Sequence, residues 1–147
     1  MTAPSQLLIA GCSRRKTATA VPVPALELYQ GGCIPALRAR AGTRRSLRGR
    51  IRILSAEHGL VTADTPLLPY DRELDAGRAA QLLPAVARAI AGAGIRAGQG
   101  TELLVIAGPA YLALVAAALP AGTPAVWVPD PYDWARAAVV LDRWGWP

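Results

Sequence analysis

Short apolar runs alternate with longer amphipathic stretches along the 147-residue chain. Each run is followed directly by turn-forming residues, which is typical of buried strands. Four such runs predict strands at residues 6–10, 51–54, 103–107 and 125–128. We expect the run at residues 6–10 to form a central strand, because it is almost wholly apolar.

The stretches between these runs repeat apolar residues at the spacing of one helical face. They predict helices at residues 25–40, 76–93, 109–119 and 134–144. Asp75 and Asp133 are expected to cap the second and fourth helices, and Pro109 suits the first position of the third. Two glycines and a proline weaken the first helix. Residues 55–71 and 92–100 are predicted to form loops.

Strands that alternate with helices predict a parallel sheet with helices on both faces. We therefore expect an α/β fold, as a single three-layer domain over residues 1–147 with a mostly parallel sheet of about four strands. Polar loops follow all four predicted strands, with the sequences GCSRRK, SAEHG, GPAY and PDPYD. Because the carboxyl ends of parallel strands lie at one edge of the sheet, these loops are expected to line a shared pocket.

The composition excludes several classes of protein. Hydrophobic residues make up 52% of the chain and charged residues 18%, which excludes a disordered protein. No apolar run reaches the roughly 18–20 residues of a membrane span, so we expect no membrane partner. With only Cys12 and Cys33 a disulfide framework is not expected, and the start of the chain lacks the basic region of a secretory signal. These features predict a cytoplasmic protein with free thiols.

The net charge of +6 is unevenly distributed and suggests contact with nucleic acid. Seven arginines lie between Arg38 and Arg52, and they would suit the phosphate backbone of DNA or RNA. The alternative is a set of solvated arginines favoured by a GC-rich coding bias, because Lys16 is the only lysine. Four tryptophans are candidates for base stacking, with core packing as the alternative: Trp127, Trp134, Trp144 and Trp146.

The loop that contains Gly11, Cys12, Ser13 and Lys16 combines a small residue, a hydroxyl group, backbone N–H groups and three cations. This combination is typical of a cradle for a phosphate or carboxylate. The spacing does not fit a Walker A loop or a Gly-x-Gly-x-x-Gly dinucleotide turn. The alternative is a basic surface turn. Cys12 would also suit an activated thiolate, although small cysteines at strand ends are commonly buried and inert.

Three residues are candidates for acid–base or electrostatic catalysis. His58 and Glu57 would supply proton transfer near neutral pH. The alternative is a histidine packed at the strand end with its ring bonded to the backbone. Asp71 is the third candidate, and the alternative is a turn in which it pairs with Arg72. One histidine and two distant cysteines lack the spacing of a zinc site, so we expect neither a metal nor another cofactor.

Four segments carry a resemblance to a known family: Cys12-Ser13-x-x-Lys16, Leu28-Tyr29 before a glycine, Leu54-Ser55-Ala56-Glu57-His58-Gly59-Leu60, and Pro69-Tyr70-Asp71. Together they resemble short bacterial and phage domains of unknown function that are similar to the YaaA peroxide-stress proteins. The Cys-Ser-x-x-Lys loop is also similar to that of archaeosine-type tRNA-modification enzyme domains. The resemblance covers the first half of the chain and implies a nucleic-acid or nucleobase context, with a uracil-DNA-glycosylase-like or Rossmann-like sheet. Tyrosine also occupies the position of His58 in these relatives, so the resemblance does not require this histidine for catalysis.

These observations predict a nucleotide- or nucleoside-binding enzyme that acts on a nucleobase or its N-glycosidic bond. The expected catalytic residues are Asp71, His58 and Glu57. A fixed carboxylate is useful because cleavage of this bond creates positive charge on the sugar. The expected ligand-binding residues are Gly11, Cys12, Ser13, Lys16, Tyr29, Ser55, Gly59, Tyr70 and Gly108. The alternatives are a non-catalytic nucleic-acid-binding stress-response protein and a small-ligand sensor.

Overall fold

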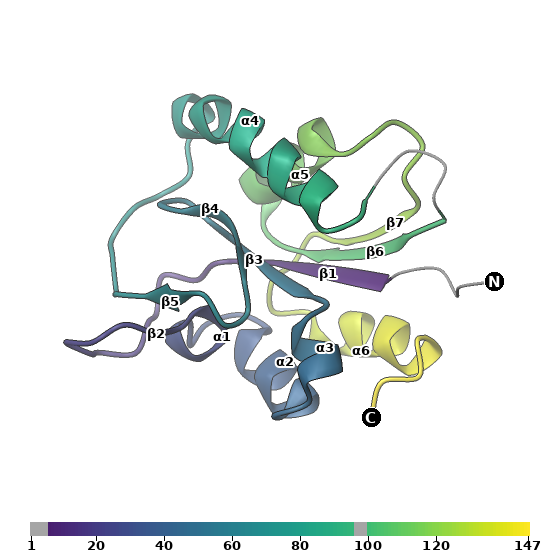
Figure 1. Ribbon diagram of the computed structural model, residues 1–147, viewed down its shortest axis with the longest axis horizontal. Coiled ribbons are helices and arrows are strands. Elements are labelled where there is room, and N and C mark those ends of the chain that lie inside the picture. Colours follow the sequence, from purple (N-terminus) through teal and green to yellow (C-terminus); the bar gives the residue numbers. More distant parts are fainter. Residues whose placement is uncertain (1–5, 96–99) are drawn as a thin grey trace.

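The computed structural model describes residues 6–95 and 100–147. Its centre is a five-stranded sheet with helices on both sides (Figure 1). In spatial order the strands are β4 (Gly59–Thr62), β3 (Ile51–Ser55), β1 (Gln6–Gly11), β6 (Glu102–Ile106) and β7 (Ala125–Val128). Every neighbouring pair is parallel except β3 with β4, so the fold is α/β with a mostly parallel sheet.

The sheet contains one strand more than the sequence predicts. The four predicted strands are confirmed as β1, β3, β6 and β7. The fifth, β4, lies in the segment predicted as a loop and folds back on β3, where Gly59 has a left-handed φ of +77° that suits a tight reversal. In a second, smaller sheet β5 (Pro66–Leu67) pairs with β2 (Val23–Pro24). These extra pairings fix the path of the chain on its way to Tyr70.

In the described part of the chain, six helices form the outer layers: α1 (Ala25–Leu28), α2 (Ile34–Ala41), α3 (Arg45–Arg48), α4 (Ala76–Gly92), α5 (Pro109–Ala118) and α6 (Trp134–Arg143). Helices α4 and α5 cover one face of the sheet, and the others cover the opposite face (Figure 1). Side chains of β1 alternate between the two resulting cores, with Leu8 and Ala10 in one and Leu7 and Ile9 in the other. None of the described helices has the length and apolar character needed to span a membrane.

Local sequence signals determine where the longer helices begin. The Asp75 carboxylate accepts a 2.7 Å hydrogen bond from the backbone N–H of Arg78 at the start of α4. Asp133 accepts one of 3.2 Å from the backbone N–H of Arg136 at the start of α6. Pro109 is the first residue of α5, where no N–H donor is needed. These three predictions are confirmed, whereas the loop predicted for residues 92–100 lies partly outside the described residues.

The prediction of one continuous helix over residues 25–40 is wrong. Helices α1 and α2 are separated by five residues, and the chain is extended at Tyr29 (φ −86°, ψ 130°). Tyr29 forms an antiparallel bridge with Lys16, and Gly32 has a left-handed φ of +62°. The glycines and this long-range pairing override the helical spacing of the apolar residues. The interruption brings this segment alongside the loop that follows β1.

Strand β1 lies in the middle of the sheet, and its two neighbours are reached by separate crossovers. The chain passes from β1 to β3 on one side, and after β4 and α4 it continues into β6 on the other side. The carboxyl end of β1 is therefore the topological switch point, where ligands of open α/β sheets bind. The loop after β1 is consequently the first place to look for a site.

Candidate functional site

The loop after β1 is held by the segment that separates α1 from α2. The backbone N–H of Gln30 donates a hydrogen bond of 2.9 Å to the carbonyl of Arg15. The Ser13 hydroxyl donates to the same carbonyl (2.7 Å) and accepts from the N–H of Gly31 (3.1 Å). A Cβ atom at Gly31 would lie 2.8 Å from the Cβ of Ser13, so no side chain fits there. The break in the predicted helix thus positions the loop.

Two cavities meet at this loop and share residues 12–14 in their walls. The first has a volume of about 200 Å³ and includes residues 31–34 and 131–132. The second has a volume of about 330 Å³ and includes Tyr111 and residues 71–74. Both cavities therefore lie at the carboxyl end of β1, where the strand order changes direction.

The second cavity contains charges of both signs. Arg14 and Lys16 line it together with Asp71 and Glu73. Arg14 forms an exposed ion pair with Glu73, whereas none of the ion pairs within the described residues involves Asp71. Burial lowers the pKa of Lys16, while the negative charge of Asp71 acts in the opposite direction. Asp71 is thus a carboxylate close enough to Lys16 to influence it, and it has no direct ion-pair partner in the described part of the chain.

Three hydroxyl groups form a hydrogen-bonded chain beside this cavity. The Ser55 hydroxyl accepts from the backbone N–H groups of Glu57 (3.1 Å) and His58 (3.0 Å) and lies 2.6 Å from the Tyr70 hydroxyl. The Tyr70 hydroxyl in turn lies 2.7 Å from that of Tyr29. Both lone pairs of Ser55 are occupied, so its proton is donated to Tyr70. Tyr29 is fully buried, and within residues 6–95 and 100–147 Tyr70 is the only hydrogen-bond partner of its hydroxyl, so we assign the Tyr29 proton to this bond. Tyr70 therefore accepts two hydrogen bonds, and its own proton remains for a further acceptor.

Tyr29 and Tyr70 are neutral hydrogen-bonding groups. Burial raises the pKa of Tyr29 to about 12 and also raises the pKa of Tyr70 above its usual value. The Lys16 ammonium group lies 4.4 Å from the centroid of the Tyr70 ring, at the distance of a cation–π contact. Tyr70 and Arg14 also line a third, adjoining cavity of about 550 Å³. Neutral donors and cations together favour a ligand rich in hydrogen-bond acceptors.

Replacement of Ser55 by alanine is expected to lower the free energy of unfolding by about 1–3 kcal/mol, because two backbone N–H groups lose their acceptor. Ser55 is fully buried, so solvent does not replace the lost hydroxyl. Urea denaturation of the wild type and Ser55→Ala measures the difference. Ser46→Ala, at an exposed position of α3, is the control and should change stability by less than about 0.5 kcal/mol. Equal stability of the two variants would contradict the role assigned to Ser55.

The structure divides the predicted site residues into three groups. The three cavities bring together Gly11, Cys12, Ser13, Lys16, Tyr70 and Asp71. Tyr29 and Ser55 support Tyr70 through hydrogen bonds. Tyr29 and Ser55 do not line the cavities themselves, and the remaining predicted residues also lie outside the cavity walls: Glu57, His58, Gly59 and Gly108. Gly59 instead shapes the reversal after β3, and Gly108 is the N-cap of α5.

The two predicted acid–base residues beside β3 have other contacts. His58 is exposed, and its ring packs edge-on against the Tyr70 ring with centroids 5.3 Å apart. The Glu57 carboxylate lies 3.4 Å from the Arg72 guanidinium. Arg72 is therefore engaged by Glu57 rather than by Asp71, the partner that the sequence offered as an alternative. The Asp71 carboxylate therefore lines the second cavity without an ion pair to Arg72.

Sequence reasoning missed Tyr111, whose hydroxyl lies 3.3 Å from the Cys12 sulfur in the wall of the second cavity. A Cβ atom at Gly11 would lie 3.0 Å from the Cβ of Ala107, so the small residue lets β1 end close to the segment that follows β6. The signal was the GPAY segment after β6, which was expected at this edge, at the start of a helix, but with no role for its tyrosine. Among residues 6–95 and 100–147, no group of three His, Cys, Asp or Glu side chains is placed to hold a metal ion.

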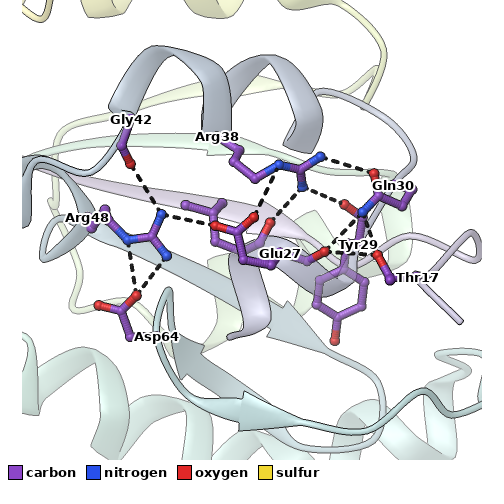
Figure 2. Close-up of polar contacts among 9 residues, drawn as sticks. Thr17, Glu27, Tyr29, Gln30, Arg38, Gly42, Arg48 and Asp64 are labelled. Atoms are coloured by element: carbon purple, nitrogen blue, oxygen red, sulfur yellow. Dashed lines mark hydrogen bonds and ion pairs between the residues drawn. The ribbon is translucent and has the colours of Figure 1, made fainter. Parts of the chain in front are cut away.

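The arginine-rich segment between Arg38 and Arg52 is partly occupied by internal contacts. Figure 2 shows Arg38 and Arg48 on two sides of Glu27, with Arg48 also bound to Asp64. Arg38 further donates to two backbone carbonyls, at 2.8 Å and 3.2 Å. The side chains of these two arginines are only 23% and 12% exposed. They hold α1, α2 and α3 together rather than forming a free cationic surface.

The four tryptophans belong to the two hydrophobic cores. Trp146 is buried in one core, and the others pack against a core as partly buried side chains. The Trp144 indole N–H donates a 2.9 Å hydrogen bond to the carboxylate of Glu102. These contacts support the packing alternative and give the tryptophans no part in a base-binding surface.

A family of unknown function, DUF6884, matches residues 7–130 of the chain. The match spans more than half of the 147 residues and includes the β1 loop, Asp71 and Tyr111. The chain belongs to this family. Of the residues that line the first two cavities, Pro131 and Tyr132 lie beyond the part that DUF6884 matches. No curated protein matches the chain.

Proposed function

We propose that this protein is a nucleotide- or nucleoside-binding enzyme that acts on a nucleobase or its N-glycosidic bond. The observation that carries the proposal is the second cavity, in which Arg14 and Lys16 lie together with the Asp71 carboxylate at the switch point. The cations would suit a phosphate, and the carboxylate would suit positive charge that develops on a sugar. A phosphorylated nucleoside needs both kinds of group within the length of one ligand.

The β1 loop would hold the phosphate end of this ligand. Its backbone is fixed by the contacts of Ser13, so the cations Arg14 and Lys16 project from a rigid support. Glu73 would release Arg14 when a phosphate arrives, because an exposed ion pair contributes only about 0–1 kcal/mol. The negative phosphate would then replace the Glu73 carboxylate as the ion-pair partner of Arg14.

The second cavity would hold the sugar and the bond that breaks. In a hydrolysis, the bond between the sugar C1′ and the base nitrogen breaks, and its electron pair leaves with the base. Water adds to C1′, and the proton released ends on the base. Asp71 would stabilise the oxocarbenium character of the transition state, and Tyr70 would offer its remaining proton to an acceptor of the base. Tyr70 lines the adjoining third cavity. We assign Glu57 and His58 no direct step, because neither lines any of the three cavities.

The finer assignments of fold and ancestry are part of the same proposal. The motifs around Cys12 and Tyr70 imply a uracil-DNA-glycosylase-like architecture and similarity to the YaaA proteins. A central β1 with a cavity at its carboxyl end supports this architecture and a Rossmann-like one equally.

The two alternative functions make different demands on the chain. A nucleic-acid-binding stress-response protein would use the arginines between Arg38 and Arg52, but Arg38 and Arg48 are held by internal ion pairs. A small-ligand sensor would use the same second cavity without turnover, and Asp71 would then have no catalytic part. The experiment on Lys16 below separates the proposal from the first alternative.

Nucleotide binding is expected to depend on Lys16 and not on the exposed pair Arg44 and Arg45. Lys16→Ala should weaken the affinity for AMP, GMP, UMP and CMP about tenfold or more, because a charge-assisted hydrogen bond to phosphate contributes roughly 1.5–3 kcal/mol. The double variant Arg44→Ala/Arg45→Ala should change it by less than about fivefold, since exposed charges contribute little. Calorimetric titration of both variants measures the difference. Equal losses would indicate a diffuse electrostatic surface and overturn the proposed phosphate site.

A further inference from the structure

The first cavity is left without a role by the proposed function. It shares residues 12–14 with the second cavity but extends away from Asp71, toward residues 31–34 and the turn at Pro131 and Tyr132. Its volume of about 200 Å³ is below the roughly 300 Å³ at which separate small-molecule pockets begin. It is therefore better suited to be one compartment of a larger site than a site of its own.

The walls of the first cavity suit a flat, uncharged group. Among the residues that the structure describes, no carboxylate lines it, and Arg14, which it shares with the second cavity, is its only charged residue. Tyr132 lines the cavity with 74% of its surface exposed, which leaves the ring free to stack. Proteins that bind single-stranded nucleic acids combine exposed aromatic rings with cationic groups, because every base presents a π face on which such a ring can stack.

The turn that carries Tyr132 is fixed by local contacts. The Asp130 carboxylate accepts a hydrogen bond of 2.9 Å from the backbone N–H of Tyr132, and the Tyr132 carbonyl accepts one of 2.9 Å from the N–H of Trp134. Across the cavity, a Cβ atom at Gly32 would lie 3.0 Å from the Pro131 carbonyl oxygen, so the two walls approach closely. The Tyr132 ring is therefore presented from a held position.

We propose that the ligand is a dinucleotide unit that spans both cavities, an inference that rests on the proposed function. The phosphodiester lies at Ser13 and Arg14, and the reacting nucleoside occupies the second cavity beside Asp71. The base of the neighbouring nucleotide occupies the first cavity and stacks on Tyr132. The unit belongs either to a free dinucleotide or to a single strand of nucleic acid, since both contain the same chemistry.

Titration of the dinucleotide ApA and of AMP against Tyr132→Ala tests this inference. The variant should bind ApA about 5- to 150-fold more weakly than the wild type, the range for loss of one base–aromatic stack, and should bind AMP within about twofold. The ratio of variant to wild-type affinity is taken for each probe, so the different charges of the probes cancel. Tyr132→Trp should retain the affinity for ApA. Val139→Ala is the matched control, because Val139 is 67% exposed on α6 and lines none of the three cavities.

The outcomes separate this inference from the proposed function. An unchanged affinity of Tyr132→Ala for ApA, or an equal loss for ApA and AMP, would overturn the dinucleotide assignment while leaving nucleotide binding intact. Failure of the folded wild type to bind AMP, ApA or single-stranded oligoadenylate would overturn both. Tighter binding of the oligoadenylate than of ApA supports the inference and identifies a strand as the source. Equal binding supports it and identifies a free dinucleotide.

Discussion

Asp71→Asn is expected to lower the rate of base release on the order of 10²-fold or more, because it removes a charge needed chiefly in the transition state. Asp71 lines the second cavity and has no ion-pair partner among the described residues, so its charge is available to a substrate. The asparagine has nearly the same shape, and the fold should remain intact. Affinity for nucleotides should be unchanged or slightly higher, since a negative charge near Lys16 is removed.

Base release is measured from a panel of nucleosides, nucleotides and nucleic acids, with nucleotide affinity measured in parallel. Glu73→Gln is the matched control, because Glu73 is a carboxylate in the same cavity that is already paired with Arg14. Its base release should stay close to the wild-type rate. Wild-type rates in Asp71→Asn would remove Asp71 from the mechanism. Binding without base release by the wild type would favour the small-ligand sensor.

Much of the fold was predictable because local sequence determines it. The four parallel strands are short apolar runs. Three of them, β1, β3 and β6, are buried because they lie in the interior of the sheet, whereas β7 lies at its edge and is mostly half-buried. Asp75 and Asp133 cap helices through contacts three residues away, which a short sequence window contains. Strand β4 was missed because its exposed and half-buried residues give no strong apolar signal. Its pairing with β3 depends on the reversal at Gly59.

The part of the site that the sequence did not reveal depends on contacts between distant residues. Tyr29 has helical spacing with its neighbours, yet its bridge to Lys16 makes it extended. Tyr111 reaches Cys12 across 99 positions of the chain, so no local motif contains the pair. The strand order, in contrast, explains why the loops after β1 and β3 were correctly expected at the same edge.

The arginine-rich segment shows that contacts between distant residues also limit the prediction of charged surfaces from sequence. Counting charges along the sequence suggested a free cationic surface between Arg38 and Arg52. The count contains no information about Glu27, which lies outside the segment and engages both Arg38 and Arg48. Charge balance in the fold is therefore set by side chains that pack together, and only part of the segment, including Arg44 and Arg45, is left exposed.

Gly31→Ala is expected to destabilise the protein by about 1–3 kcal/mol, the usual cost of overpacking, and to weaken nucleotide binding. The added Cβ would lie 2.8 Å from the Ser13 Cβ, so the β1 loop must shift away from its present position. The Ser13 hydroxyl would then lose its 3.1 Å bond from the Gly31 N–H, and Arg14 and Lys16 would move with the loop. Gly31 has no left-handed φ, so the effect reports the close approach and not backbone strain.

Gly92→Ala provides the matched control for this prediction. Gly92 is the last residue of α4, and a Cβ atom there meets nothing within 4 Å. Alanine at that position should stabilise the protein by about 0.4–1 kcal/mol, because it restricts the unfolded chain. Thermal unfolding and titration with AMP are measured for both variants. If Gly31→Ala kept wild-type stability and affinity, the loop after β1 would be able to move without loss, and it could not be the rigid support that the proposed phosphate site requires.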